Sequence, residues 1–208
     1  RNRPGGFTDK EIALAESFRD QAVIAIENVR LFKETQEALE RQTATADILK
    51  VIAGSPSDVQ PVLDAIIAKA QQLIGGYSGT LWRRAGDQMY LAAYTTTNQA
   101  GIEALKARSP LPLNDEDFIP RELQAGHKIV IPDTETDTQM PEIWREVARK
   151  RGYRAMLSVP MIRDGQFAGV ISVTRAEPGP FASQQVELMQ TFADQAVIAI
   201  ENVRLFNE

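Results

Sequence analysis

The sequence predicts an α/β protein of the α+β type, with a central antiparallel sheet, helices on both of its faces and a long helix in front of it. Two observations favour this fold. Apolar residues near both ends of the chain recur with the 3.6-residue period of helices, whereas several short segments within residues 80–174 alternate with the period of two that strands show. Short turns join neighbouring strand segments, and such turns permit antiparallel pairing, because parallel strands need long crossovers.

The first predicted element is one long helix from Asp9 to about Ala53. This segment contains neither Pro nor Gly, and Thr8 followed by Glu11 supplies an N-terminal cap. Roughly 45 residues at about 1.5 Å each give a helix on the order of 65 Å long. Its middle has a partly polar seam with a 3.5-residue period, which predicts a weak parallel coiled coil. A plain exposed connector helix is the alternative.

A near-identical repeat links the two ends of the chain. The segment Phe18–Phe32 recurs as Phe192–Phe206 with a single difference, Arg19 against Ala193. The spacing corresponds to a domain with its linker and is too long for a solenoid repeat. We therefore expect the sequence to be a piece of a tandem-domain protein whose modules are joined by long helices.

Each copy of the repeat carries an apolar stripe at helical spacing, with small residues that would let a second helix approach closely. We expect a parallel homodimer through these helices. The predicted dimer-interface residues are Phe18, Ala22, Ala25, Val29, Phe32, Leu39, Phe192, Ala196, Ala199 and Val203.

The middle of the chain predicts the sheet. A helix begins at the capping box Ser57–Gln60 and ends at Gly75-Gly76, and residues 95–117 form an irregular excursion with a short helical pattern. Asp164-Gly165 is typical of a two-residue type I′ hairpin turn. The remaining predicted elements are strands over residues 80–82, 88–94, 128–131, 155–162 and 167–174, and helices over residues 118–124, 140–151 and 183–208.

Several of these segments resemble one family. They are Ile131-Pro-Asp133, Arg154-Ala-Met-Leu-Ser-Val-Pro160, Phe167-Ala-Gly-Val-Ile171, Phe181 and Ala196-Val-Ile-Ala-Ile-Glu-Asn202. Together they resemble the GAF domain. The resemblance implies a GAF domain over residues 54–208, a coiled-coil-like linker over residues 35–53, and the terminal helix of an upstream GAF-like domain over residues 1–34. The linker is similar to those of bacterial multidomain sensor histidine kinases and related cyclases.

The resemblance also implies a small-molecule pocket between the sheet and the excursion. Met156 and Ser158 share one face of their predicted strand, while Leu157 and Val159 occupy the other face and should meet the terminal helices. Core packing is the alternative role for every candidate. The candidate ligand-binding residues are Tyr94, Phe118, Ile131, Asp133, Trp144, Tyr153, Met156 and Ser158.

The composition is that of a folded cytoplasmic protein. Apolar residues make up 43% of the 208 positions, charged residues 25%, and the net charge is -5. We therefore expect no nucleic acid as a partner. No apolar run approaches the roughly 20 residues that cross a bilayer, so we expect no membrane contact in this stretch. The basic residues Arg145, Arg149, Lys150, Arg151 and Arg154 are mixed with glutamates, which favours a solvated helix face over a phosphate-binding patch.

Residue types that carry chemistry are scarce. The chain has no cysteine, which excludes disulfides, thiolate metal sites and thioether-bound cofactors, and His127 is its single histidine. We expect no metal, no cofactor and no catalytic residue. Two acidic groups could ligate a hard cation, but loop solvation is the preferred interpretation. They comprise Asp115, Glu116 and Asp117, and Asp133, Glu135 and Asp137.

The function expected from these patterns is sensory. The domain would bind a small molecule, or receive an upstream rearrangement, and relay the change through dimeric helices to an output domain, in the manner of two-component phosphorelay signalling. The full-length protein would then be a histidine kinase or a nucleotide cyclase. The alternative is a structural dimerisation scaffold without a ligand. The motif of cyclic-nucleotide-binding members of the resembled family is not visible, which disfavours that ligand.

Overall fold

The computed structural model describes residues 7–54, 58–113 and 118–207, and the chain divides into two units, Arg1–Thr45 and Ala46–Glu208. Helix α1 spans Asp9–Gly54, so it accounts for the first unit from Asp9 onward and continues past Thr45, and it confirms the predicted long helix. Its start is capped reciprocally, because Thr8 N donates to Glu11 Oε2 (2.8 Å) and Glu11 N donates to Thr8 Oγ1 (3.3 Å).

The second unit is built on a six-stranded antiparallel sheet with the strand order β3-β2-β1-β6-β5-β4. Five strands fall within a few residues of their predicted positions, and the short β3, which pairs with β2, was not predicted from the sequence. The strands are β1 (Ser78–Ala85), β2 (Gln88–Tyr94), β3 (Leu111–Pro112), β4 (Ile129–Ile131), β5 (Ala155–Arg163) and β6 (Gln166–Arg175).

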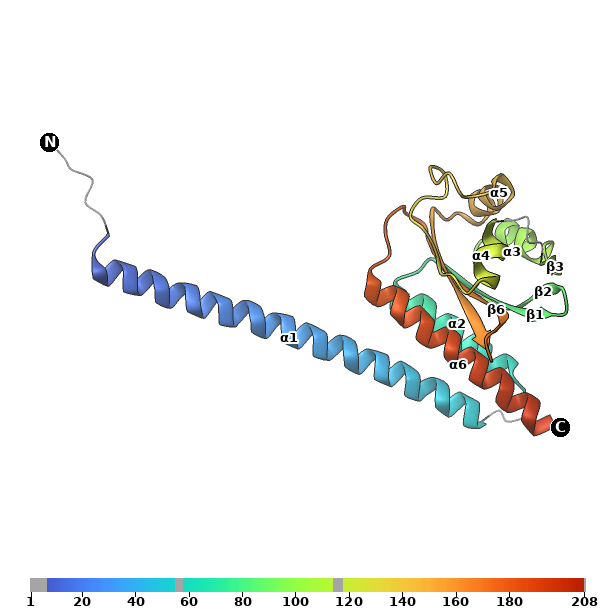
Figure 1. The fold of residues 1–208 in the computed structure, drawn as a ribbon, viewed down its shortest axis with the longest axis horizontal. Coiled ribbons are helices and arrows are strands. Elements are labelled where there is room, and N and C mark those ends of the chain that lie inside the picture. The colour runs from blue at the N-terminus through green and yellow to red at the C-terminus, as the bar shows by residue number, and fades with distance from the viewer. Residues whose placement is uncertain (1–6, 55–57, 114–117, 208) are drawn as a thin grey trace. The chain divides into compact units, whose positions relative to one another are not determined.

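Helices cover both faces of this sheet, as Figure 1 shows. Two long helices lie side by side on one face, and three short helices lie over the other. The long pair is α2 (Gln60–Ile74) and α6 (Ser183–Asn207), and the short set is α3 (Gln99–Lys106), α4 (Phe118–Gln124) and α5 (Glu142–Arg151). The predicted α+β fold with helices on both faces is therefore confirmed.

Local turn chemistry sets several element ends. Gly75 and Gly152 adopt left-handed conformations that close α2 and α5, and Asp164 and Gly165, with φ of 51° and 75°, form the expected hairpin turn between β5 and β6. The predicted capping box of α2 needs correction. Its N-cap residue is Val59, without a side-chain cap, and Ser57 lies outside the described residues.

The two faces of the sheet are distinguished by strand alternation. Leu81, Leu157 and Val173 are fully buried on the face that α2 and α6 cover. Contact there is close, because a Cβ atom on Gly79 would lie 2.6 Å from Ile67 Cδ1 in α2. The opposite face, beneath α3, α4 and α5, carries the second part of the core.

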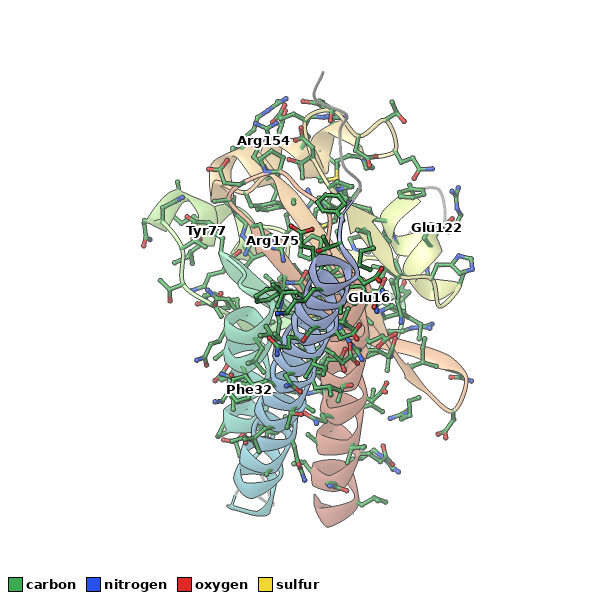
Figure 2. All side chains as sticks on the ribbon, turned by 90° about the vertical axis from the view of Figure 1, so that its left-hand side faces the viewer. Glu16, Phe32, Tyr77, Glu122, Arg154 and Arg175 are labelled. Atoms are coloured by element: carbon green, nitrogen blue, oxygen red, sulfur yellow. The ribbon has the colours of Figure 1, made fainter. Side chains whose placement is uncertain are left out.

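The structure corrects the predicted dimer interface within α6. Phe192, Ala196 and Ala199 are at most 1% exposed, because this stripe packs into the core of its own domain, and they are not available to a second chain. Val203 is half-buried. The predicted residues in α1 are exposed, including Phe18 at 63% and Phe32, which is labelled in Figure 2. Within the part of the chain that is described, no helix is both long and apolar enough to span a bilayer.

Candidate functional site

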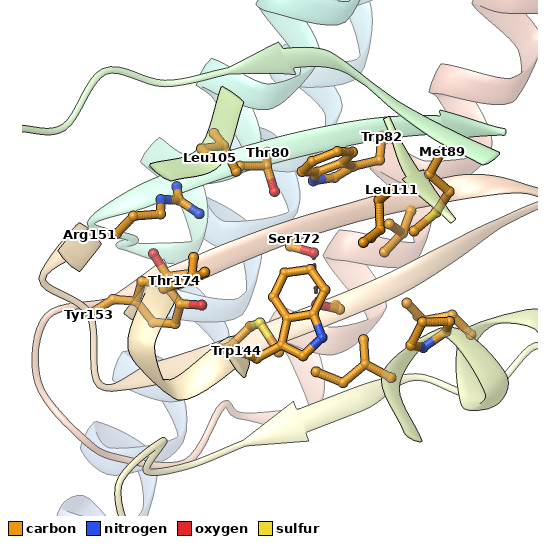
Figure 3. Close-up of a pocket in the computed structure, with 17 residues that line it drawn as sticks. Thr80, Trp82, Met89, Leu105, Leu111, Trp144, Arg151, Tyr153, Ser172 and Thr174 are labelled. Atoms are coloured by element: carbon orange, nitrogen blue, oxygen red, sulfur yellow. Dashed lines mark hydrogen bonds between the residues drawn. The ribbon is translucent and has the colours of Figure 1, made fainter. Parts of the chain in front are cut away.

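A partly open cavity of about 50 Å³ lies between the sheet and the three short helices. Strands β1, β5 and β6 form its floor, and α3, α4 and α5 contribute to its roof (Figure 3). Its position follows from the fold, because the inward-facing residues of the three central strands alternate with those that contact α2 and α6. The cavity and the two long helices are therefore separated by the sheet alone.

The floor of the cavity is polar. Thr80, Ser158, Ser172 and Thr174 line it from three adjacent strands. Ser158 Oγ and Ser172 Oγ lie 2.7 Å apart across β5 and β6, and Thr174 Oγ1 lies 2.7 Å from Ser78 Oγ across β6 and β1. Buried hydroxyl groups without hydrogen-bond partners destabilise an apolar core. In this domain the hydroxyls of each pair bond to each other, which satisfies part of their hydrogen-bonding capacity.

The walls of the cavity are aromatic and aliphatic. Trp82 and Trp144, the two tryptophans of the sequence, both line it, together with Tyr153 and Met156. The guanidinium of Arg108 stacks on the Trp144 ring at 4.3 Å from the centroid and holds that ring in place. The indole nitrogen of Trp144 is buried and has no hydrogen-bond partner.

Arg151 supplies the charge at the cavity. It extends from the last turn of α5, is 4% exposed and donates from Nη2 to Ser78 Oγ at 2.8 Å. Figure 3 shows its guanidinium pointing toward the side chains of Thr80 and Thr174. Its Nε is buried without a partner, and its Cζ lies 5.5 Å from the centre of the Tyr153 ring.

Burial controls the titration of both groups. Loss of hydration lowers the pKa of the Arg151 guanidinium from its ordinary value, and burial raises the pKa of the Tyr153 phenol. Within the described residues that line the cavity, Arg151 is the single charged side chain, and no described carboxylate forms an ion pair with it. The site therefore holds a buried positive charge without a counter-charge.

The roof is fixed by a second arginine. Arg145 Nη1 donates to Thr134 O at 2.6 Å, and Nη2 donates to Asp137 O and Met140 O at 3.2 and 3.0 Å. These bonds fasten the loop before α5 to the helix that carries Trp144 and Arg151. A bridged roof of this kind positions the two side chains over the floor.

Four of the eight sequence-predicted ligand-binding residues line the cavity, namely Trp144, Tyr153, Met156 and Ser158. The other four lie outside it. Tyr94, Phe118 and Ile131 belong to the surrounding apolar core, and Asp133 lies in the loop after β4, where both its oxygens accept bonds from Arg154. Asp133 is held by this ion pair and by Glu135 N, which lower the pKa of its carboxyl group.

The sequence interpretation missed Arg151, Thr80, Trp82, Ser172 and Thr174. Arg151 was assigned to a solvated face, which holds for Arg149 and Lys150 and is wrong for Arg151. The sequence did contain a signal for the burial of Arg151. Position 151 lies four and three residues after the apolar Val147 and Ala148, which is the helical spacing of one face. The hydroxyl residues carried no such signal, since Ser and Thr in strands are common.

The part of the chain that the structure describes contains no cluster of metal-binding side chains. No three His, Asp or Glu side chains among the described residues lie close enough to hold a metal ion. His127 lies on the surface, with Nδ1 at 2.8 Å from Glu122 Oε2, an interaction that lowers the pKa of Glu122. Asp115, Glu116 and Asp117 lie outside the described residues.

The sheet order, with long helices on one face and a cavity under short helices on the other, defines an α+β domain with one candidate site. A family model for the GAF domain matches residues 58–200, more than half of the chain. The chain therefore belongs to the GAF domain family. No curated protein matches it in a parallel comparison.

Solved structures share the fold. The GAF domain of a phosphoenolpyruvate-protein phosphotransferase from Coxiella burnetii has a TM-score of 0.64 at 16% identity, over 82% of this chain and 98% of that one. A phycoerythrobilin-bound GAF domain from a cyanobacterial phytochrome gives 0.62 at 18%, over 81% and 98%. A free methionine-R-sulfoxide reductase from Neisseria meningitidis, solved with its substrate, gives 0.62 at 17%, over 82% and 93%.

Proposed function

We propose that this chain is a sensory GAF module that binds a small molecule in the cavity and relays the change through its long helices. The observation that carries the proposal is a buried site with a polar floor and two donors, Arg151 Nε and Trp144 Nε1, that have no partner among the described residues. Native cores leave few polar atoms unsatisfied, so two at one cavity favour a ligand.

The relay route follows from the strand alternation. Ser172 and Thr174 face the cavity, while their neighbour Val173 faces the long helices, and Gly79 contacts Ile67 of α2 directly beside Thr80. A ligand that moves the floor strands would therefore displace α2 and α6. Close-packed interfaces respond to such a displacement by shifting between discrete arrangements. We therefore expect the helices to rotate or to change register.

The repeat supports the proposed domain organisation. The stripe that α6 buries against its own domain is the same stripe that α1 exposes, because Phe18, Ala22 and Ala25 correspond to Phe192, Ala196 and Ala199. We assign residues 1–34 to the exit helix of a preceding GAF-like domain, residues 35–53 to a helical linker and residues 54–208 to the GAF domain. A bacterial, cytoplasmic histidine kinase or nucleotide cyclase in a two-component pathway is the proposed context.

The proposed parallel homodimer needs a seam that the domain does not already cover. On α6, Ile198 and Leu205 remain 51% and 58% exposed, seven residues apart on the face away from the sheet. Their equivalents in α1, Ile24 and Leu31, are exposed as well. A seven-residue spacing of large aliphatic side chains is the pattern of a coiled-coil seam.

The sensory function is tested with a ligand screen on the whole chain. A metabolite that enters the cavity should raise the melting temperature and change the fluorescence of Trp82 and Trp144, because binding to the native state alone stabilises it. Nucleotides, amino acids and aromatic compounds form the screen. A flat response in both measurements across all three classes would contradict a sensory role.

The small volume of the cavity favours one alternative. At about 50 Å³ the site is much smaller than the roughly 300–1,000 Å³ of typical ligand pockets, as expected for a scaffold that only joins two chains. Light scattering in the same experiment separates the two functions. A dimeric mass together with a flat ligand response would favour the scaffold.

A further inference from the structure

We infer that this cavity takes a small monocarboxylate whose carboxylate group pairs with the guanidinium of Arg151. The inference rests on the proposed sensory function, since it names the class of ligand for the same site. The charge, the unpaired donors and the size of the cavity support a monocarboxylate.

The buried charge of Arg151 lacks an anionic partner in the described part of the chain. The side chain is almost fully buried, and it contacts two neutral groups, the Ser78 hydroxyl and the face of the Tyr153 ring. An isolated ion in a protein interior is costly unless an opposite charge compensates it. Among the described residues no carboxylate does so. An anionic ligand would supply the missing charge.

Two N–H donors at the cavity lack acceptors among the described residues. They are Arg151 Nε and Trp144 Nε1, which are both buried, and both residues line the same cavity. A carboxylate has two oxygens and offers about four acceptor positions. Bound water would satisfy the donors but would leave the guanidinium without a counter-charge. A carboxylate paired with Arg151 supplies both an acceptor and the counter-charge.

The walls and the volume define the rest of the ligand. Trp82, Leu105 and Met156 present apolar surface to the cavity, which disfavours a fully hydrated inorganic anion and favours a short hydrocarbon tail. A cavity of about 50 Å³ holds roughly three to five water-sized groups, because each needs about 10–15 Å³. Acetate and propionate are ligands of this size.

The experiment uses the whole chain and compares propionate with propionamide, its neutral isostere, at ionic strength matched with sodium chloride. The two indole N–H signals of the ¹⁵N-labelled protein come from Trp82 and Trp144, so both report on the cavity. Propionate should move the indole signals in a saturable manner, because both rings line the cavity that it enters. Propionamide should bind at least tenfold more weakly.

Two variants and one control test whether propionate binds at Arg151. Arg151→Met should weaken propionate binding at least tenfold, and Trp144→Phe should weaken it while assigning the indole signal. Arg149→Met is the matched control on the exposed side of α5, where its guanidinium pairs with Glu135 and Glu142, and it should leave propionate binding unchanged. If Arg151→Met does not fold, the propionamide comparison on the unchanged chain still decides the question.

The outcomes separate this inference from the sensory function. Equal affinity for propionate and propionamide, or unchanged propionate binding by Arg151→Met, overturns the carboxylate inference. If carboxylates leave both indole signals unmoved while a neutral compound of the screen binds, the carboxylate inference fails and the sensory function stands. If nothing binds, both fail.

Discussion

At the scale of single residues, the domain uses arginines in two different ways. Arg154 donates from two nitrogens to the Asp133 carboxylate, and Arg145 donates to backbone carbonyls and pairs with Glu142, so both fasten loops to the sheet and to α5. Arg151 is buried with a partner for only part of its guanidinium. Satisfied arginines stabilise structure, whereas an uncompensated one indicates a place where something binds.

The Asp133–Arg154 pair gives a pH-dependent prediction. The bonds from Arg154 lower the folded-state pKa of Asp133 below its ordinary 3.8, so the stabilisation is complete above pH 3.8 and is lost as the pH falls through the folded-state pKa. Asp133→Asn should therefore lower the free energy of unfolding at neutral pH, and the difference from the unchanged chain should shrink in acid. Urea unfolding at stepwise lower pH measures this.

Asp137→Asn is the control for that experiment. Asp137 lies in the same loop and accepts a bond from Gln139 N through one oxygen, which an asparagine can replace. It should behave like the unchanged chain at every pH. A pH-independent loss of stability in Asp133→Asn would show that the ion pair is not the cause.

A second residue-scale prediction concerns Gly169 in β6. A Cβ atom there would lie 2.1 Å from the backbone oxygen of Trp82, which cannot move without breaking the pairing with β1. Gly169→Ala should destabilise the domain by about 1–3 kcal/mol, as overpacked cores do. Gly179 has the same φ of 155° with no atom within 4 Å, so Gly179→Ala is a matched control that should cost much less in urea unfolding.

At the scale of elements, one helical sequence has two environments. Residues 18–32 in α1 and 192–206 in α6 differ at a single position, yet the stripe is exposed in the first copy and buried in the second. Helix propensity is the same for both copies, so the difference arises from packing alone. The repeat therefore provides an internal comparison of a helix with and without its sheet.

That comparison yields a prediction. Phe192→Ala should lower the free energy of unfolding by about 3–5 kcal/mol, because it leaves a cavity in the core. Phe18→Ala, in nearly the same local sequence, should change it by less than about 0.5 kcal/mol. Tryptophan fluorescence during urea unfolding isolates the domain, since Trp82 and Trp144 both belong to it. Equal effects of the two substitutions would contradict the assignment of the stripe.

At the scale of the whole molecule, the proposed homodimer depends on apolar residues that the domain leaves uncovered. Ile198→Glu should convert the dimer to a monomer, because a carboxylate at the seam is desolvated in each chain and repels its copy. Light scattering measures the mass. Ile143→Glu is the control, since Ile143 has the same 51% exposure but lies in α5, on the other side of the sheet. A dimeric mass for Ile198→Glu would show that the dimer interface does not include Ile198.

Much of the fold could be predicted from the sequence because its signals are local. The boundaries of α4, the strand β2 and the β5–β6 turn depend on nearby Gly, Pro and alternating apolar residues, which act within a few positions. The short β3 escaped prediction, since a two-residue strand has no periodicity of its own and exists through its pairing with β2.

The sequence by itself determined the order of every element except β3, the GAF-like fold and the repeat. The tertiary structure alone decided which faces are covered and which residues line the cavity. Burial depends on neighbours that are distant in the chain, so the same stripe is exposed in α1 and buried in α6. Arg151, which solvated cations surround in the sequence, is buried with its Nη2 on Ser78 of β1, 73 positions away. Half of the predicted pocket residues lie outside the cavity for the same reason. Strand alternation determines which face of the sheet a side chain occupies, but it does not determine which helix covers that face.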